Sequence, residues 1–288
     1  MKTIVLTAFA LMALAGNSVL GRLALRGEQI DAASFTAIRL LSGIVVLAVI
    51  LKIARSRPHQ KHHSNGSWAA AFMLFLYAIA FSYAYISLDT GIGALILFGA
   101  VQITMILMGI IGGHKLHTLE WGGLLVAFSG FVYLVMPGVT APSLTGFILM
   151  TVAGIAWGFY TLAGKGSVSP LGDTAFNFLR TLPFVLILLV ITLQYSNMSQ
   201  EGVILAMLSG GITSGVGYTI WYAALEGLSA IQAAVVQLLV PVIATFGGVI
   251  FADEMFTFRL VLSSVLILCG VLIVILGKSY SERKLALQ

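Results

Sequence analysis

The side chains in this sequence best suited to handling a small molecule are amides and aromatic residues placed inside long apolar stretches. Tyr77 and Phe81 are four residues apart, so on a helix they lie along one stripe. Tyr and Trp rings combine a flat apolar face with a hydrogen-bonding tip, which suits contact with a small amphipathic solute. The candidate binding residues are Asn17, Tyr77, Phe81, Gln102, Trp157, Tyr160, Tyr218, Trp221 and Gln237.

The aromatic residues have a structural alternative, the belt that Tyr and Trp form at a membrane surface. Tyr85 and Tyr222 are near the ends of their stretches and fit this belt better than a pocket. Tyr77 and Tyr218 are deeper in theirs, and for these two residues we favour a cavity.

The amides also have two interpretations. A primary amide away from water needs partners for two donors and an acceptor. A hydrogen bond between helices, of about 1 kcal/mol, satisfies Asn17, Gln102 or Gln237 as well as a ligand does. Structural and binding roles are therefore equally supported for these three residues.

Two arginines and a proline interrupt the apolar stretches. Arg39 and Arg180 lie near the start of theirs, where a long side chain can reach head groups. A charge at the membrane centre would instead cost roughly 2.5–3.5 kcal/mol. We interpret both arginines first as structural anchors or gate partners, and second as receptors for a substrate carboxylate. Pro241 removes a backbone hydrogen bond and permits a bend.

Groups for catalysis or metal binding are missing from the apolar stretches. Asp, Glu and His occur only at their ends or in loops, and Cys269 is the single cysteine. An enzyme would need a base or a nucleophile at depth, and carriers of organic cations commonly use a membrane-embedded carboxylate. His59, His62 and His63 are interpreted as part of a solvated basic loop. The sequence predicts no enzyme, cofactor or metal site, and it disfavours a cationic drug antiporter.

The composition is that of an integral membrane protein. Of the 288 residues, 59% are hydrophobic and 9% are charged, whereas a soluble domain has about 25% charged residues. The mean hydropathy is +1.05. Loop residues supply the net charge of +5, which indicates contact with anionic lipid head groups and does not imply nucleic acid.

Ten apolar stretches have the length that a helix needs to cross about 30 Å of hydrocarbon. They are residues 4–21, 32–52, 68–88, 92–113, 119–136, 144–164, 174–193, 203–225, 229–251 and 258–277. The first stretch has the features of a cleaved signal peptide, but its counterpart at residues 144–164 argues that it is retained. We predict an all-α integral membrane protein with ten transmembrane helices.

Positive charges in the connections predict the orientation. The side of the N-terminus carries Lys2, Lys52, Arg55, Arg57, Lys61, Lys115, Lys165, Lys278, Arg283 and Lys284, and the other side carries Arg22, Arg26 and Arg259. Because Lys and Arg collect on the cytoplasmic side, both termini are predicted to be cytoplasmic, in a multi-pass protein of the inner (plasma) membrane.

The chain also repeats itself. The sequence FTAIRLL at Phe35–Leu41 parallels FNFLRTL at Phe176–Leu182, and Gly130 and Gly270 fall at matching depth in the fifth and tenth stretches. A unit of five helices is odd in number, so the second copy must enter the membrane from the opposite face, which predicts two inverted five-helix repeats. The predicted units are residues 1–138, residues 139–278 and a cytoplasmic tail at residues 279–288.

With this repeat, the sequence resembles the drug/metabolite transporter superfamily, in its ten-helix branch of paired EamA-type domains. The resemblance rests on Trp157-Gly158, Arg180, the pattern LSAIQAAVVQLLVPVIA and Asp253-Glu254 in the second half, and on Arg39 and TGIGALILFGAVQ in the first. It departs from the pattern where Ala15-Gly16 stands in place of Trp-Gly, where no proline matches Pro241, and at His114-Lys115. The resemblance implies transport of small metabolites such as amino acids, and it places Trp157 and Tyr160 beside the pathway.

These observations predict a secondary transporter of a small neutral or zwitterionic, amino-acid-like metabolite, acting as an exporter by alternating access around a midplane cavity. The alternative is a membrane-embedded enzyme, or a sensor or scaffold that does not transport. An enzyme would need activating groups deep in the apolar stretches. A scaffold would usually bring a soluble domain or a long tail, whereas the C-terminal tail here, residues 278–288, has only eleven residues.

Overall fold

The chain forms a helical bundle in the computed structural model, which describes residues 2–55, 66–113, 118–136, 141–164, 167, 169–225, 227–228 and 236–286. No strand occurs in these ranges, and their single β-bridge joins Ile30 to Met198. Eight of the described helical stretches are long and apolar enough to cross a membrane, and two apolar helices are shorter. The all-helical prediction is therefore confirmed for the described residues.

The elements follow the predicted stretches closely. They are α1 (Lys2–Arg26), α2 (Ala32–Arg55), α3 (Trp68–Tyr85), α4 (Thr90–Ile111), α5 (Thr118–Val135), α6 (Leu144–Gly164), α7 (Pro170–Arg180), α8 (Leu182–Thr192), η1 (Leu193–Tyr195), α9 (Gln200–Met207), η2 (Leu208–Val216), α10 (Gly217–Leu225), α12 (Leu239–Phe251) and α13 (Phe258–Ala286). Part of the predicted stretch at 229–251, and the predicted basic loop with His59, His62 and His63, lie outside the described residues.

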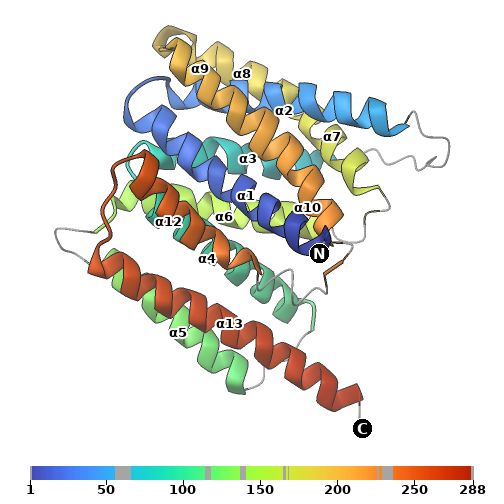
Figure 1. Cartoon of the computed structure of the whole chain (residues 1–288), viewed down its shortest axis with the longest axis vertical. Helices are drawn as coiled ribbons and strands as arrows, with labels where there is room; N and C mark the ends of the chain where they lie inside the picture. The colour runs from blue at the N-terminus through green and yellow to red at the C-terminus, as the bar shows by residue number, and fades with distance from the viewer. Residues whose placement is uncertain are drawn as a thin grey trace.

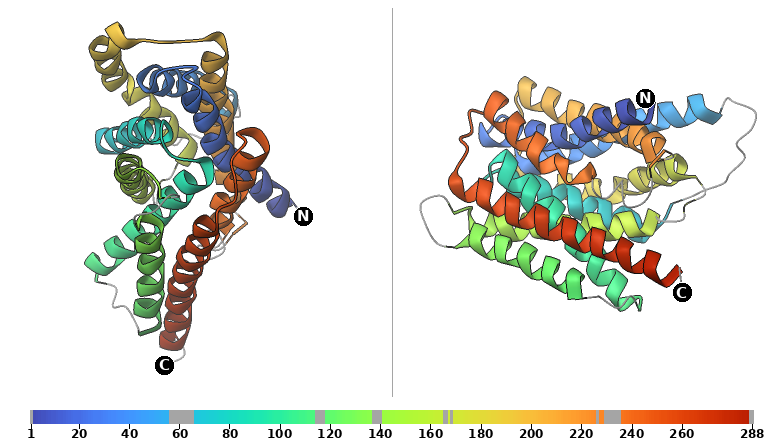
Figure 2. Two further views of the ribbon diagram at one scale, coloured as in Figure 1. Left: turned by 90° about the vertical axis from the view of Figure 1, so that its left-hand side faces the viewer. Right: turned by 60° about the horizontal axis from the view of Figure 1, so that its bottom comes forward.

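The helices run side by side in a stack (Figure 1). The pair α5 and α13 forms one edge of the stack, and α2, α8 and α9 form the other. Between the two edges, α1 packs against α10 and α12, and α6 packs against α3 and α4. The two chain ends lie toward the same end of the helices, while the α1–α2 and α12–α13 connections lie at the opposite end (Figures 1 and 2).

Two of the predicted stretches are interrupted. The stretch at 174–193 breaks at Thr181 into α7 and α8, because Pro183 in the first turn of α8 has no N–H to donate to the preceding turn. The stretch at 203–225 contains nine residues of π-helix, η2. A π-turn has i→i+5 hydrogen bonds and often marks a functional position.

The C-terminal helix is longer than predicted. We expected a span at 258–277 followed by a tail at 279–288, whereas α13 continues through Ala286. The residues after Gly277 include Lys, Glu, Arg, Leu and Ala, all of which are good helix formers, so the helix has no sequence signal to stop at the edge of its apolar part.

Helices α5 and α13 approach each other through glycines. A Cβ on Gly123 would lie 2.7 Å from the carbonyl oxygen of Gly270, and a Cβ on Gly130 would lie 2.8 Å from Ile267. Since small residues let helix backbones meet closely in a membrane, this pair depends on the absence of side chains at these positions.

We expect Gly270→Leu to destabilise the protein by about 1–3 kcal/mol, because the new side chain overpacks the contact of α13 with Gly123. Thermal unfolding of the detergent-solubilised protein measures this change. Gly122→Leu is the matched control, because a Cβ at Gly122 meets nothing within 4 Å. Equal melting temperatures for the two variants would contradict the close contact.

Candidate functional site

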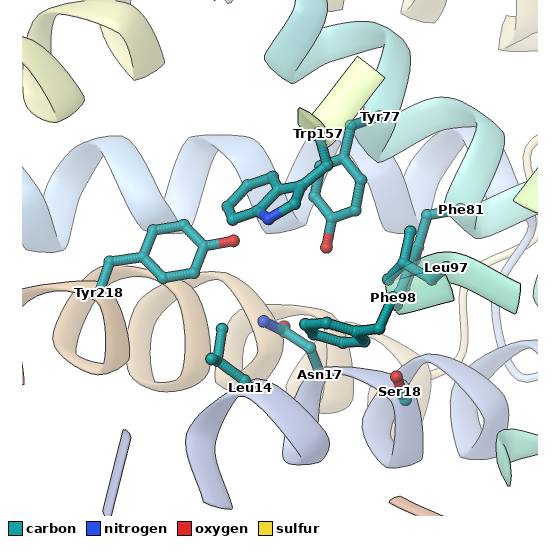
Figure 3. A pocket seen from close by; sticks show the side chains of 9 residues that line it. All are labelled: Leu14, Asn17, Ser18, Tyr77, Phe81, Leu97, Phe98, Trp157 and Tyr218. Atoms are coloured by element: carbon teal, nitrogen blue, oxygen red, sulfur yellow. The ribbon is translucent and has the colours of Figure 1, made fainter. Parts of the chain in front are cut away.

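A pocket lies in the interior of the bundle, where five helices converge (Figure 3). The space left free between its side chains has room for about one water molecule. Helices α1, α3, α4, α6 and α10 contribute the lining residues, which are Leu14, Asn17, Ser18, Tyr77, Phe81, Leu97, Phe98, Trp157 and Tyr218. Five of the nine are residues that the sequence analysis selected as binding candidates.

Trp157 is the centre of an aromatic cluster along one wall of the pocket. Its ring centroid lies 4.8 Å from that of Tyr77 and 5.3 Å from those of Tyr160 and Tyr218. Tyr77 in turn packs on Phe81 at 5.6 Å. These are contact distances for aromatic pairs, so a solute the size of an amino acid must part the rings to enter. The hydroxyls of Tyr77 and Tyr218 both point into the pocket (Figure 3).

Asn17 joins the pocket to the π-helix. Its Oδ1 accepts hydrogen bonds from Ser209 Oγ at 2.8 Å and from Thr213 Oγ1 at 2.6 Å. Its Nδ2 makes only a long contact, 3.4 Å, to Ser214 Oγ. The Asn17 oxygen therefore has a structural role, whereas its amide nitrogen can still donate to a molecule in the pocket. Asn17 thus fits both the structural and the binding interpretation of the sequence.

We expect Asn17→Leu to lower stability by roughly 1–3 kcal/mol, because the Ser209 hydroxyl loses its buried acceptor and the Thr213 hydroxyl keeps only the carbonyl oxygen of Ser209. Thermal unfolding measures the loss. Thr7→Val on the same helix is the control, since the buried Thr7 hydroxyl has no hydrogen-bond partner and its removal should cost nothing. A neutral result for Asn17→Leu would show that the hydrogen bonds to η2 do not contribute.

Arg39 on α2 packs against the rings of Tyr77 and Phe81 and is 2% exposed. Its Nη2 donates to the Tyr77 hydroxyl at 2.8 Å, and its Cζ lies 4.5 Å from the centroid of Phe81. Arg39 therefore does not reach out to lipid head groups, because protein encloses its guanidinium. Arg180, its counterpart in sequence, is partly exposed and lies with Cζ 5.7 Å from the Trp68 ring.

The other predicted site residues lie near the pocket or away from it. Tyr160 touches Trp157 from outside the lining, Gln102 is buried on α4, and Trp221 is partly buried on α10. Gln237 is partly buried just before α12, and Pro241 occupies the first turn of α12, where its missing N–H breaks no helical bond.

Tyr85 overturns a prediction. We expected it in an interfacial belt, but it is 0% exposed, and its hydroxyl donates to Thr90 O at 3.3 Å. Its ring packs on Phe81 at 4.7 Å, so the stripe of Tyr77 and Phe81 continues one turn further than the belt interpretation allowed.

The lining residues that the sequence analysis missed are Leu14, Ser18, Leu97 and Phe98. All four have the side-chain types that fill ordinary apolar helices, so their own identity carries no signal. Ser18 follows Asn17 directly, and Leu97 and Phe98 lie within the motif TGIGALILFGAVQ. These positions, beside a selected residue or inside that motif, are the signal by which Ser18, Leu97 and Phe98 could have been found.

One turn beyond the pocket, Arg22 ties together three parts of the chain. Its Nη2 pairs with Asp89 at 2.9 Å and its Nε pairs with Glu254 at 3.3 Å. Its Nη1 donates to the carbonyl oxygens of Tyr85 and Ile86. The side chains of Arg22 and Glu254 are 7% and 6% exposed, whereas that of Asp89 is half-exposed. The sequence analysis treated these residues only as charges at helix ends.

Glu254 also caps α4 from a distant part of the chain. Its carboxylate accepts from the backbone N–H of Thr90 at 2.8 and 2.9 Å and from Thr90 Oγ1 at 3.0 Å. A carboxylate at a helix N-terminus satisfies unpaired N–H groups and opposes the positive end of the helix dipole. Arg22, Asp89 and Glu254, which we call the closure triad, therefore join α1, the start of α4 and the α12–α13 connection, one turn beyond Ser18 of the pocket lining.

Comparison with known proteins gives a consistent group of relatives. The profile described as EamA-like transporter family matches residues 144–276. An uncharacterized protein of Pseudomonas aeruginosa is 45% identical over 284 residues, which is 98% of each chain. An uncharacterized transporter of Bacillus subtilis, YoaV, is 22% identical over 247 residues, covering 82% of this chain and 85% of its own.

A solved structure has the same fold. It superimposes with a TM-score of 0.60 at 13% sequence identity and covers 92% of this chain and 95% of its own. At this identity the similarity concerns the arrangement of the helices and carries no information on a ligand.

Proposed function

Since this chain belongs to the EamA-like transporter family of the drug/metabolite transporter superfamily, we propose that it exports a small neutral or zwitterionic, amino-acid-like metabolite as a secondary carrier. The family makes it a multi-pass membrane transporter, and it favours transport over catalysis. Substrate class, direction and mechanism are the parts that we propose.

The observation that carries this proposal is the interior pocket. Aromatic faces, two tyrosine hydroxyls and the Asn17 amide line it, which is the mixture that holds a small amphipathic solute. It lies between layers of helices, and the ion pairs of the closure triad join these helices one turn beyond it, where we propose that they close one end. A carrier that works by alternating access needs a central site and a closed end that opens in the other state.

For the architecture, we propose ten spans in two inverted repeats, residues 1–138 and 139–278, with the remainder as a cytoplasmic tail. The eight long and two shorter apolar helices support this count. Arg39 and Arg180 each follow a phenylalanine by four residues, in α2 and α7, the second helices of the two proposed repeats. The excess of Lys and Arg on the side of the chain ends supports cytoplasmic termini in an inner membrane.

Purified protein in liposomes tests this function. Counterflow of labelled amino acids and related neutral metabolites should exceed that of empty liposomes, and unlabelled substrate should compete. Right-side-out and inside-out cell vesicles with the same solute then separate export from import. Correctly folded protein that moves no solute of the panel in either orientation would overturn the proposal.

A further inference from the structure

We propose that the Arg39 guanidinium receives a carboxylate of the transported solute, so that the carrier takes metabolites with a carboxylate on a small apolar body. This inference rests on the proposed function, because it names the chemical class that the pocket selects. It assigns Arg39 a binding role ahead of the anchoring role suggested by its sequence position.

The first argument is the state of the charge. Arg39 is 2% exposed, and its Nη1 has no hydrogen-bond partner. No carboxylate among the described residues forms an ion pair with it. The Phe81 and Tyr77 rings lie over the guanidinium at 4.5 and 5.1 Å, and such cation–π contacts offset only part of the cost of a buried charge. An incoming anion would neutralise this buried charge and accept a hydrogen bond from the unpaired Nη1.

The second argument is the distance to the pocket. Arg39 Nη2 lies 2.8 Å from the Tyr77 hydroxyl, and that hydroxyl points into the pocket (Figure 3). The hydroxyl oxygen thus occupies the place that a carboxylate oxygen would take. When Tyr77 turns aside, Nη2 loses its present acceptor, and an entering carboxylate can replace it and accept a second, parallel hydrogen bond from Nη1, which has no partner.

The third argument is the balance of donors and acceptors. Figure 3 shows the indole nitrogen of Trp157 and the amide nitrogen of Asn17 directed toward the pocket. An indole nitrogen only donates, and the Asn17 oxygen is already occupied by hydroxyls of η2. Among the described residues, no carboxylate lines the pocket. A pocket rich in donors favours a group rich in acceptors, and the aromatic faces are left for an apolar body or an ammonium.

Arg180 provides the internal contrast. It also has a buried Nη1 without a partner, but it lies against Trp68, and neither residue lines the pocket. A general effect of removing an intramembrane arginine should therefore appear at both positions. A loss of carboxylate recognition should appear at Arg39 alone.

The experiment compares amino acids with their amides, which lack the carboxylate but keep the α-amino group. Leucine, phenylalanine and serine, each beside its amide, are tested for stabilising the purified wild-type protein against thermal unfolding, since a ligand that binds the folded state raises the melting temperature. At least one acid should bind about 10-fold or more tightly than its amide, the size of a lost hydrogen bond to a charged group. Isocaproate, which is leucine without its amine, is tested in the same way. Its binding then shows whether the pocket accepts a simple monocarboxylate or only a zwitterion.

The variants assign the preference to one residue. Arg39→Gln should bind the acid and its amide equally, and Arg39→Lys should keep a reduced preference, because Lys retains the charge but not the planar fork. Arg180→Gln should keep the wild-type preference. Acid binding unchanged in Arg39→Gln, or equal binding of all acids and amides by the wild type, would overturn the inference. If Arg39→Gln does not fold, an Arg39→Lys variant with the full wild-type preference would overturn it.

Counterflow separates this failure from failure of the proposed function. Transport of an amide as fast as its acid, with the same rate in Arg39→Gln, refutes the carboxylate receptor but leaves the carrier intact. Absence of flux for every solute in folded wild-type protein refutes the carrier itself.

Discussion

Arg22→Gln should abolish transport and lower stability by roughly 3–5 kcal/mol, because it leaves the buried Glu254 carboxylate without its charged partner. The side chains of Arg22 and Glu254 are both less than a tenth exposed, and the interior around them screens charge poorly. Arg22 also supplies the link to Asp89 and to two carbonyl groups at the end of α3. This single substitution therefore removes the contacts of Arg22 with Asp89, with Glu254 and with the end of α3, one turn beyond the pocket.

The control is Arg26→Gln, one turn later on α1. Its guanidinium is exposed and donates through one nitrogen to Ala252 O at 2.6 Å. We expect it to cost about 1 kcal/mol, the usual value of one exposed hydrogen bond. Thermal unfolding and counterflow, measured on both variants, give the comparison.

A double variant tests whether the buried charge is the cause. Arg22→Gln combined with Glu254→Gln removes both charges, while the amide oxygen introduced by the second substitution can still accept from the Thr90 N–H. Stability should recover by more than half relative to the single change, whereas transport should stay low. If the two losses simply add, the buried ion pair is not what destabilises Arg22→Gln.

Opening of the pocket can be followed separately with a thiol probe. Ser18 is 1% exposed and lines the pocket, and Cys269 is the single native cysteine. In a Cys269→Ser background, Ser18→Cys should react slowly with a membrane-impermeant maleimide and faster once Arg22→Gln is added. Equal rates would mean that the closure triad does not control access from its end of the bundle.

The helices and part of the pocket could be predicted from the sequence because their signals are local. Apolar stretches of membrane length became helices, and Tyr77 and Phe81, spaced one turn apart, share a wall of the pocket. A polar or aromatic side chain that is costly in lipid must face protein, which is why Asn17, Trp157 and Tyr218 were selected and why they lie together.

Other features depend on contacts that no local pattern encodes. The closure triad joins residues 232 positions apart in sequence, and charged residues at helix ends are also expected for head-group contact. The π-helix forms where Ser209 and Thr213 meet Asn17 and where a Cβ on Gly210 would overlap the Arg39 carbonyl oxygen. Tyr85 was misplaced because nearness to a helix end did not reveal that α4 covers it.

Trp157→Ala should reduce transport at least about 30-fold while the protein still folds. The indole ring contacts the rings of Tyr77, Tyr160 and Tyr218, and each aromatic pair is worth about 0.5–1.5 kcal/mol. These three contacts stabilise the fold, whereas the ring face that the indole offers to the solute is worth roughly 2 kcal/mol of binding, or about 30-fold in affinity. Counterflow at low substrate concentration measures this loss, and size-exclusion chromatography reports on folding.

Two variants show whether the ring or its nitrogen matters for Trp157. Trp157→Phe keeps a flat ring in the cluster but loses the N–H that points into the pocket, so it should retain most of the flux for an apolar solute and lose part of it for a carboxylate. Trp121→Ala removes a tryptophan that is 52% exposed on α5 and should leave transport unchanged. Because the Trp157 ring contacts the pocket tyrosines of both α3 and α10, wild-type flux in Trp157→Ala would show that the solute crosses the membrane by a route outside this pocket.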